Sequence, residues 1–99
     1  MARIAVTRTI HALPGKRQQH LDFLKRSDAV RRQWGMVESL VMEKAVDPQV
    51  LVVIQIWQSD ERYQAWQRSA ERAAVIAEGR RLRVREPGLL YRVIEDTRA

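Results

Sequence analysis

The stretch from Val50 to Trp57 constrains the fold more than any other part of the chain. Its eight residues are apolar except for Gln55, and Val and Ile dominate it. Such a run is typical of a strand that is covered on both faces in the interior of a sheet. Ser59 then supplies a side-chain hydroxyl suited to capping a helix, and Asp60 adds negative charge to the first turn. The rest of the chain must therefore provide neighbouring strands and a cover for both faces.

The remaining elements are predicted from hydrophobic periodicity and from turn-forming residues. We expect a strand over residues 3–11, a helix over 16–33, a weaker edge strand over 36–45, a helix over 60–79 with a break near Ser69, and a last strand over 88–95. The segment Asp47-Pro48-Gln49 predicts the turn of a hairpin between the edge strand and the central strand. The basic segment over residues 80–87 is interpreted as a connection.

This β-α-β-β-α-β order predicts one α+β, ferredoxin-like domain over residues 1–99. The sheet is expected to be four-stranded and antiparallel, with the first and third strands in its centre. Right-handed crossovers would put both helices on one face. Apolar side chains on the other face would stay in water, which costs about 25 cal/mol per Å² of apolar area. We therefore expect two chains to stack these faces as a two-fold symmetric homodimer, a dimeric α/β barrel.

Composition excludes several classes of site. The 99 residues include no Cys, so the chain has neither disulfides nor thiolate metal ligands. His11 and His20 are not four residues apart and have no third ligand beside them, so we expect no metal. The longest apolar run, Val50 to Ile54, is far too short to span a membrane, and the N-terminus lacks the pattern of a signal peptide. We expect a cytoplasmic protein with no membrane partner.

The chain carries a net charge of +6, with 15 Arg and 3 Lys. A basic balance favours anionic partners, whereas basic residues interleaved with acids are typical of a solvated surface. Only the segment from Arg80 to Arg85 is densely basic, and no helix-turn-helix, zinc-finger or RNA-recognition motif accompanies it. We therefore favour a solvated surface and expect no nucleic-acid partner, while the role of this cluster stays open.

Two polar residues lie where apolar ones are expected. Arg8 shares its face of the first strand with Ile4 and Val6. Either it lies near the strand end and reaches water, or it points into a pocket under the helices. His20 lies one turn before Leu24 on the apolar stripe of the first helix. A histidine there is either a packed core residue or a general base.

Three segments carry a family resemblance. They are LPGKRQQHLDFL after the first strand, Gly35 before the second strand, and VVIQIWQSDERYQAWQRS, in which Trp57-Gln58-Ser59 ends the third strand and Trp66 follows nine residues after Trp57. These segments resemble the antibiotic biosynthesis monooxygenase (ABM) domain family over nearly the whole chain. The resemblance implies a dimeric α+β barrel. Some members oxidise polyketide-type aromatic substrates with O₂ and use neither metal nor flavin, whereas others bind and degrade haem.

The haem-degrading branch is similar at one position and differs at two. It has a Trp at the position of Trp66, where the ring would lie over the porphyrin. Its iron-ligating His corresponds to Ile76 here, and an Asn late in its first strand corresponds to Arg8. Haem iron needs His, Cys, Met or Tyr as a ligand. The resemblance therefore favours the cofactor-free activity, and His20 would replace the missing ligand only if its geometry fitted.

The resemblance implies a monooxygenase without a cofactor that acts on a small aromatic, quinone-like or polyketide-like substrate. The expected catalytic residues are Arg8 to stabilise a substrate anion, His20 to accept its proton, and Trp66 to stack on its ring. Trp34 and Tyr63 are expected to bind the substrate. Two alternatives stay open: a protein of the same superfamily that binds or degrades haem or another planar ligand, and a non-catalytic dimer in which Trp66 is only a core anchor.

Overall fold

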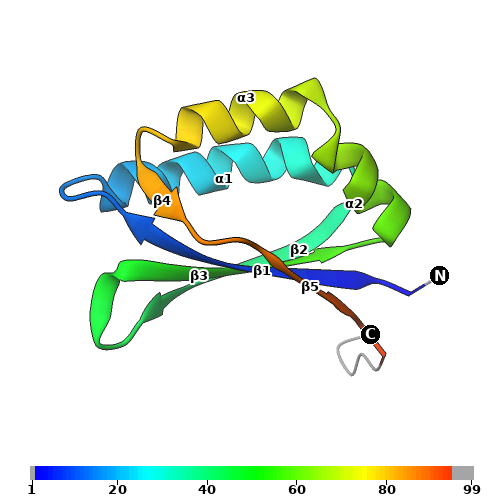
Figure 1. The fold of residues 1–99 in the computed structure, drawn as a ribbon, viewed down its shortest axis with the longest axis horizontal. Helices are drawn as coiled ribbons and strands as arrows, with labels where there is room; N and C mark the ends of the chain where they lie inside the picture. The colour runs from blue at the N-terminus through cyan, green and yellow to red at the C-terminus, as the bar shows by residue number, and fades with distance from the viewer. Residues whose placement is uncertain (1, 95–99) are drawn as a thin grey trace.

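The structure is a computed structural model of the chain, and it describes residues 2–94. Within that range the elements are β1 (Ile4–Ala12), α1 (Arg17–Gln33), β2 (Met36–Lys44), β3 (Asp47–Trp57), α2 (Asp60–Gln67), α3 (Ala70–Gly79), β4 (Arg83–Arg85) and β5 (Leu89–Arg92). The helices all lie on one face of a single antiparallel sheet (Figure 1). The predicted α+β, ferredoxin-like architecture is confirmed.

β1 and β3 form the centre of the sheet, as the apolar composition of β3 predicts. They pair antiparallel from Ile4 opposite Trp57 to His11 opposite Val50. β2 flanks β3 on one side, and β4 and β5 both pair with the other side of β1. Residues opposite each other in this register point to the same face, so the register decides which side chains lie under the helices.

The hairpin between β2 and β3 turns earlier in the chain than expected. Residues 45–46 form the turn, and β3 already begins at Asp47. Asp47 pairs with Lys44 after a register shift in β2. Its carboxylate accepts a hydrogen bond from the Gln49 backbone N–H at 3.1 Å. The hairpin was predicted, but its turn was placed too late, because Asp47 shapes the start of the strand and not the turn.

The expected helix over 60–79 is divided into α2 and α3. Ser59 caps α2 by accepting a hydrogen bond from the Arg62 backbone N–H at 3.2 Å, and Ser69 caps α3 in the same way from Arg72 at 3.0 Å. Each cap satisfies one of the N–H groups that a helix start leaves unpaired. The break at Ser69 lets α2 lie at one end of the sheet while α3 runs beside α1 (Figure 1).

The last strand begins earlier than expected and is split. β4 pairs with residues 10–12 of β1, and β5 pairs with residues 4–7. Glu86-Pro87-Gly88 separates the two pieces, because Pro has no backbone N–H to give to a ladder. The interpretation of residues 80–87 as a connection was wrong for Arg83–Arg85, since a three-residue strand is too short to show a two-residue period. Residue 95 of the expected strand lies outside the described residues.

The hydrophobic core lies between the sheet and the helices. Trp57, Phe23, Ile10 and Leu51 are fully buried there. The Trp57 ring packs edge-on against Tyr63 at a centroid distance of 5.2 Å and lies 6.0 Å from the ring of Trp66. These aromatic contacts attach α2 to the end of β3, so the helix that follows the central strand packs directly onto it.

The other face of the sheet has no helix over it among residues 2–94 (Figure 1). We call it the bare face and define it by alternate residues of three strands: Leu40 and Met42 of β2, Val52 and Ile54 of β3, and Leu89 and Tyr91 of β5. Leu40, Leu89 and Tyr91 are each more than half exposed. None of the described helices is long and apolar enough to cross a membrane.

Candidate functional site

A cavity of about 40 Å³ lies between the sheet and the helices. Its walls combine apolar side chains from the core, two aromatic residues of α2 and five arginines. The arginines come from four elements and are Arg8 (β1), Arg31 (α1), Arg72 (α3), Arg83 and Arg85 (β4). Arg8, Arg72 and Arg85 are only half-buried, so the cavity communicates with solvent on their side. A small polar chamber thus interrupts the core at its basic edge.

Arg8 points into this cavity. It pairs with Val53 in the register of β1 and β3, which puts its side chain on the helix-facing side. Its Nη1 donates a hydrogen bond to the Glu86 carbonyl oxygen at 3.1 Å. A Cβ added at Gly88 would lie 2.6 Å from Arg8 Nη2, so the glycine leaves room for the guanidinium. Of the two readings of Arg8, the structure supports the one with a charge under the helices.

Burial lowers the pKa of Arg8, the charge of Arg72 lowers it further, and charge and hydrogen-bond interactions with Tyr63 act in the opposite direction. Tyr63 and Trp66 lie one turn apart on α2, and both are buried and line the cavity. Their position follows from the Ser59 cap, which sets where α2 begins and therefore which of its faces meets the sheet. The two rings belong to the core and to the cavity wall at once.

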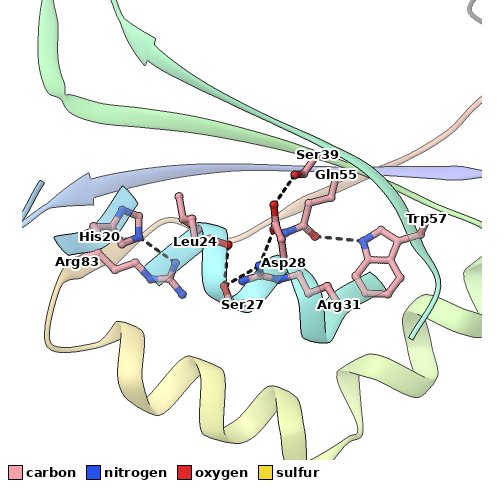
Figure 2. Close-up of polar contacts among 9 residues, drawn as sticks. All are labelled: His20, Leu24, Ser27, Asp28, Arg31, Ser39, Gln55, Trp57 and Arg83. Carbon is pink, nitrogen blue, oxygen red and sulfur yellow. Dashed lines mark hydrogen bonds and ion pairs between the residues drawn. The ribbon is translucent and has the colours of Figure 1, made fainter. Parts of the chain in front are cut away.

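Trp34 and His20 do not line the cavity. Trp34 is half-buried at the C-terminal end of α1, and its ring lies 6.3 Å from that of Trp66. His20 is completely buried, and its Nε2 accepts a hydrogen bond from Arg83 Nη1 at 3.1 Å (Figure 2). Three of the five predicted site residues, Arg8, Tyr63 and Trp66, therefore line the cavity. The other two lie behind its wall: Trp34 packs near Trp66, and His20 is hydrogen-bonded to Arg83.

His20 is held in its neutral form. Burial, together with the charges of Arg83 and Arg31, lowers its pKa to about 4. Since Nε2 accepts from Arg83, the neutral ring carries its proton on Nδ1, which has no hydrogen-bond partner among the described residues. A general base needs reach to its substrate as well as basicity. This His20 has a weakened basicity and is separated from the cavity by Arg83.

Arg31 is a cavity residue that the sequence analysis missed. Only 5 % of its surface is exposed, and its Nη1 donates to Ser27 at 2.8 Å and to Asp28 at 3.0 Å. Asp28 also accepts from the Ser39 hydroxyl at 2.7 Å, which links α1 to β2 (Figure 2). A signal was present, because Arg31 continues the buried stripe of α1 through His20, Leu24 and Ser27 at helical spacing.

Arg83 and Arg85 were also missed as cavity residues, because a solvated surface was favoured for the basic residues in general and the role of the Arg80–Arg85 cluster was left open. Arg80 and Arg81 are exposed, but Arg83 and Arg85 lie opposite Ala12 and Ile10 of β1 and turn under the helices. The solvated-surface prediction was therefore wrong for these two. The available signal was that Arg83 and Arg85 alternate with Val84, which puts the two arginines on one face of a strand. Only the pairing with β1 shows that this face is the one under the helices.

Arg83 is enclosed on several sides. Its guanidinium carbon lies 5.1 Å from the centroid of the Phe23 ring, and a Cβ added at Gly79 would lie 2.7 Å from its Nη2. Burial, together with the charges of Arg85, Arg31 and Arg8, lowers the pKa of Arg83 to about 9. For Arg85 burial again comes first, and with Arg8 and Arg72 it lowers the pKa to about 10. Guanidinium groups repel one another across this cavity.

A second hollow, of about 640 Å³, lies beside the start of α2 and β5. Its lining residues are mostly exposed, and the charged ones, Asp60, Glu61 and Arg92, carry mixed signs. It is an open groove without converging polar groups, so it lacks the features expected of a site that fixes the orientation of a ligand. The smaller arginine-lined cavity is therefore the candidate site.

The candidate site does not fit a metal or haem. Among residues 2–94, no group of three His, Asp or Glu side chains is arranged to hold a metal ion. Ile76, at the position of the iron-ligating His of the haem-degrading branch, lines the cavity with an apolar side chain. His20, the remaining histidine near the core, is engaged by Arg83. Tyr63 is the remaining cavity residue of a type that can ligate iron, and it is engaged with Arg8, so no step is assigned to haem.

Comparison with known proteins agrees with the fold and with the motifs. The family model described as "Antibiotic biosynthesis monooxygenase" matches residues 3–78. No curated protein matches the chain. SnoaB, a cofactor-independent oxygenase from Streptomyces nogalater, has a TM-score of 0.85 at 12% identity, with 98% of each chain covered.

Two further solved structures share the fold. A conserved protein from Methanosarcina mazei Go1 has a TM-score of 0.78 at 18% identity, with 93% of each chain covered. Rv0793 from Mycobacterium tuberculosis has a TM-score of 0.77 at 18% identity, with 96% of this chain and 98% of that chain covered. These TM-scores show a common fold, and the family match covers most of the sequence. The chain belongs to the antibiotic biosynthesis monooxygenase family.

Proposed function

We propose that the protein is a monooxygenase that uses O₂ without a cofactor on a small, electron-rich aromatic or quinone-like substrate. Membership of the antibiotic biosynthesis monooxygenase family supports an oxidoreductase role, and SnoaB, which has the same fold, is a cofactor-independent oxygenase. The observation in this chain that carries the proposal is the convergence of Arg8, Tyr63 and Trp66 on one cavity beneath the helices.

The proposed reaction oxidises a phenol to a quinone. One atom of O₂ becomes the new carbonyl oxygen on the ring, and the other leaves as water with two hydrogens from the substrate. The substrate supplies all four electrons, so the balance needs no external reductant. The protein has to favour the phenolate over the phenol and to keep the reacting ring away from bulk water.

The roles in this proposal follow from position. The Arg8 guanidinium donates to the phenolate oxygen, and the flat face of Trp66 packs on the substrate ring while Tyr63 limits the depth of binding. Trp34 supports Trp66 from behind and acts as a positioning residue. His20 keeps Arg83 in place, and deprotonation is favoured by the positive field of the arginines instead of by transfer to His20.

A ring larger than the present cavity enters by displacing side chains on the solvent side. The cavity holds about 40 Å³, whereas small-molecule sites usually offer about 300 Å³ or more. Gln67 and Ile76 line the cavity and are half-buried, and rotation of their side chains would widen it without moving the backbone, while Arg72 and Arg85 stay at its wall. The proposal therefore includes this rotation upon substrate binding.

Oxygen consumption tests the proposal directly. Purified protein treated with a chelator is mixed with an electron-rich dihydroxynaphthalene, and O₂ uptake and quinone absorbance are followed after subtraction of the rate without protein. We expect one O₂ per quinone formed, and a loss of about 10²-fold in kcat/KM for Arg8→Met, because an oxyanion donor is removed while the aliphatic stem stays. Arg81→Met, in the exposed turn after α3, serves as the matched control. Equal rates for Arg8→Met and the unchanged protein across a panel of phenols would refute the assignment.

We further propose that two chains pack through the bare face. Its exposed leucines and Tyr91 form an apolar surface over several strands, and a second copy would remove it from water. In that arrangement each cavity lies on the helical side, away from the contact between chains.

A further inference from the structure

The cavity contains far more positive charge than its protein neighbours balance. Arg31 pairs with Asp28 at 3.0 Å, but Arg83 donates to a neutral histidine ring and Arg8 donates to a backbone carbonyl. Within residues 2–94, the guanidinium groups of Arg72 and Arg85 make no hydrogen bond or ion pair. Four of the five arginines therefore have no carboxylate partner in the part of the chain that the structure describes.

The arrangement of the strands brings two of these charges close together. Arg85 lies opposite Ile10 of β1, and Arg8 is two residues from Ile10 on the same face. Such diagonal neighbours are roughly 7–8 Å apart. Arg72 joins them from α3, where it lies one turn before Val75 and Ile76 on the side that lines the cavity. Like charges at this range destabilise the folded chain unless an anion lies between them.

The lowered pKa values of Arg83 and Arg85 agree with this geometry. Burial is the largest cause of each decrease, and the charges of neighbouring arginines add to it. Guanidinium groups present paired N–H donors that match the oxygen atoms of carboxylates and phosphates. The cavity of about 40 Å³ has room for roughly three water molecules, which is close to the size of one such oxyanion group. Its size and donors therefore both favour a single anionic head group.

We propose that this cavity binds an oxyanion group, a carboxylate or a phosphate, carried by the substrate, with Arg72 and Arg85 as its principal donors. The head group enters between β4 and α3, where these two side chains meet solvent, and the rest of the ligand lies against Trp66. This inference deepens the proposed function, and it rests on that function only for the claim that the ligand is the substrate. The protein then selects anionic aromatic compounds over neutral ones.

Binding without turnover separates this inference from the monooxygenase proposal. Isothermal titration calorimetry under nitrogen uses inorganic phosphate, benzoate and, as the uncharged analogue of benzoate, benzyl alcohol, all at one ionic strength set with NaCl. We expect saturable binding of phosphate or benzoate and none of benzyl alcohol. The tighter of the two anions identifies the group as phosphate or carboxylate. Failure of both anions to bind overturns the inference, whereas O₂ uptake by the same preparation would leave the proposed function intact.

Two variants test the assignment to particular arginines. Arg85→Met and Arg72→Met should each weaken anion binding at least tenfold. Each should also raise the Tm of the anion-free protein, because one repelling charge is removed while the aliphatic stem remains. Arg81→Met, with an exposed side chain outside the cavity, should change neither quantity. A lower Tm for Arg85→Met in anion-free buffer, or undiminished binding by both variants, would show that these arginines serve the fold and not a ligand.

Discussion

The two faces of the sheet use opposite chemistry. Beneath the helices the chain buries guanidinium groups beside Trp66 and Tyr63, whereas the bare face leaves Leu89 and Tyr91 in contact with solvent. In most proteins charges lie outside and apolar side chains lie inside. Each face therefore lacks something: the covered face lacks negative charge, and the bare face lacks an apolar cover. The two faces therefore suit different partners: an anion would bind at the covered face, and a second chain would pack on the bare face.

The largest effect is expected at the aromatic cluster of the covered face. Trp57 is fully buried, so Trp57→Ala should lower the free energy of unfolding by about 3–5 kcal/mol. Tyr91→Ala makes the matched truncation on the bare face and should cost less than about 1 kcal/mol in dilute protein, since the side chain is half exposed. Urea unfolding followed by circular dichroism measures both. Equal losses would show that the two faces are equally buried in solution.

A smaller effect is expected from pH, again on the covered face. The pKa of His20 is about 4 in the folded chain, below its ordinary value of 6.5, so only the unfolded chain takes up this proton between those values. The contribution of His20 should be constant above about pH 6.5 and decline as the pH falls towards 4, by up to about 3 kcal/mol. The quantity to compare is the difference in stability between the original chain and His20→Gln, because contributions from other groups are common to both proteins and cancel.

Urea unfolding at intervals from pH 7.5 to pH 4 gives this difference. We expect the original chain to lose more stability than His20→Gln as the pH falls. Parallel curves would mean that His20 reaches solvent, contrary to its complete burial against Arg83.

The smallest change in free energy is expected on the bare face. Ile54→Lys adds a charge at the centre of the proposed contact between chains and should weaken dimerisation at least tenfold, about 1.4 kcal/mol. Val46→Lys, in the hairpin turn with 84 % exposure, is the matched control and should leave the association unchanged. Analytical ultracentrifugation over a range of concentrations measures both. A protein that is monomeric at every concentration before substitution would remove the homodimer from the proposal.

Local patterns in the sequence determined the elements and the centre of the sheet. The apolar run before Trp57 predicts a central strand, and Ser59 and Ser69 mark helix starts by a hydrogen bond within three residues. The same local logic predicted the position of Arg8 on a face with Ile4 and Val6. These features can be predicted from the sequence because the groups that interact are close neighbours along the chain.

The convergence of the arginines was decided only by the tertiary structure. Arg8 and Arg85 lie far apart in sequence, and they meet because β4 pairs with β1 in a register that turns Arg83 and Arg85 under the helices. A shift of one residue would have turned them to the bare face. The sequence by itself determined where charges stand along the chain, and the pairing of strands determined which of them share a cavity, because register depends on contacts across the whole domain.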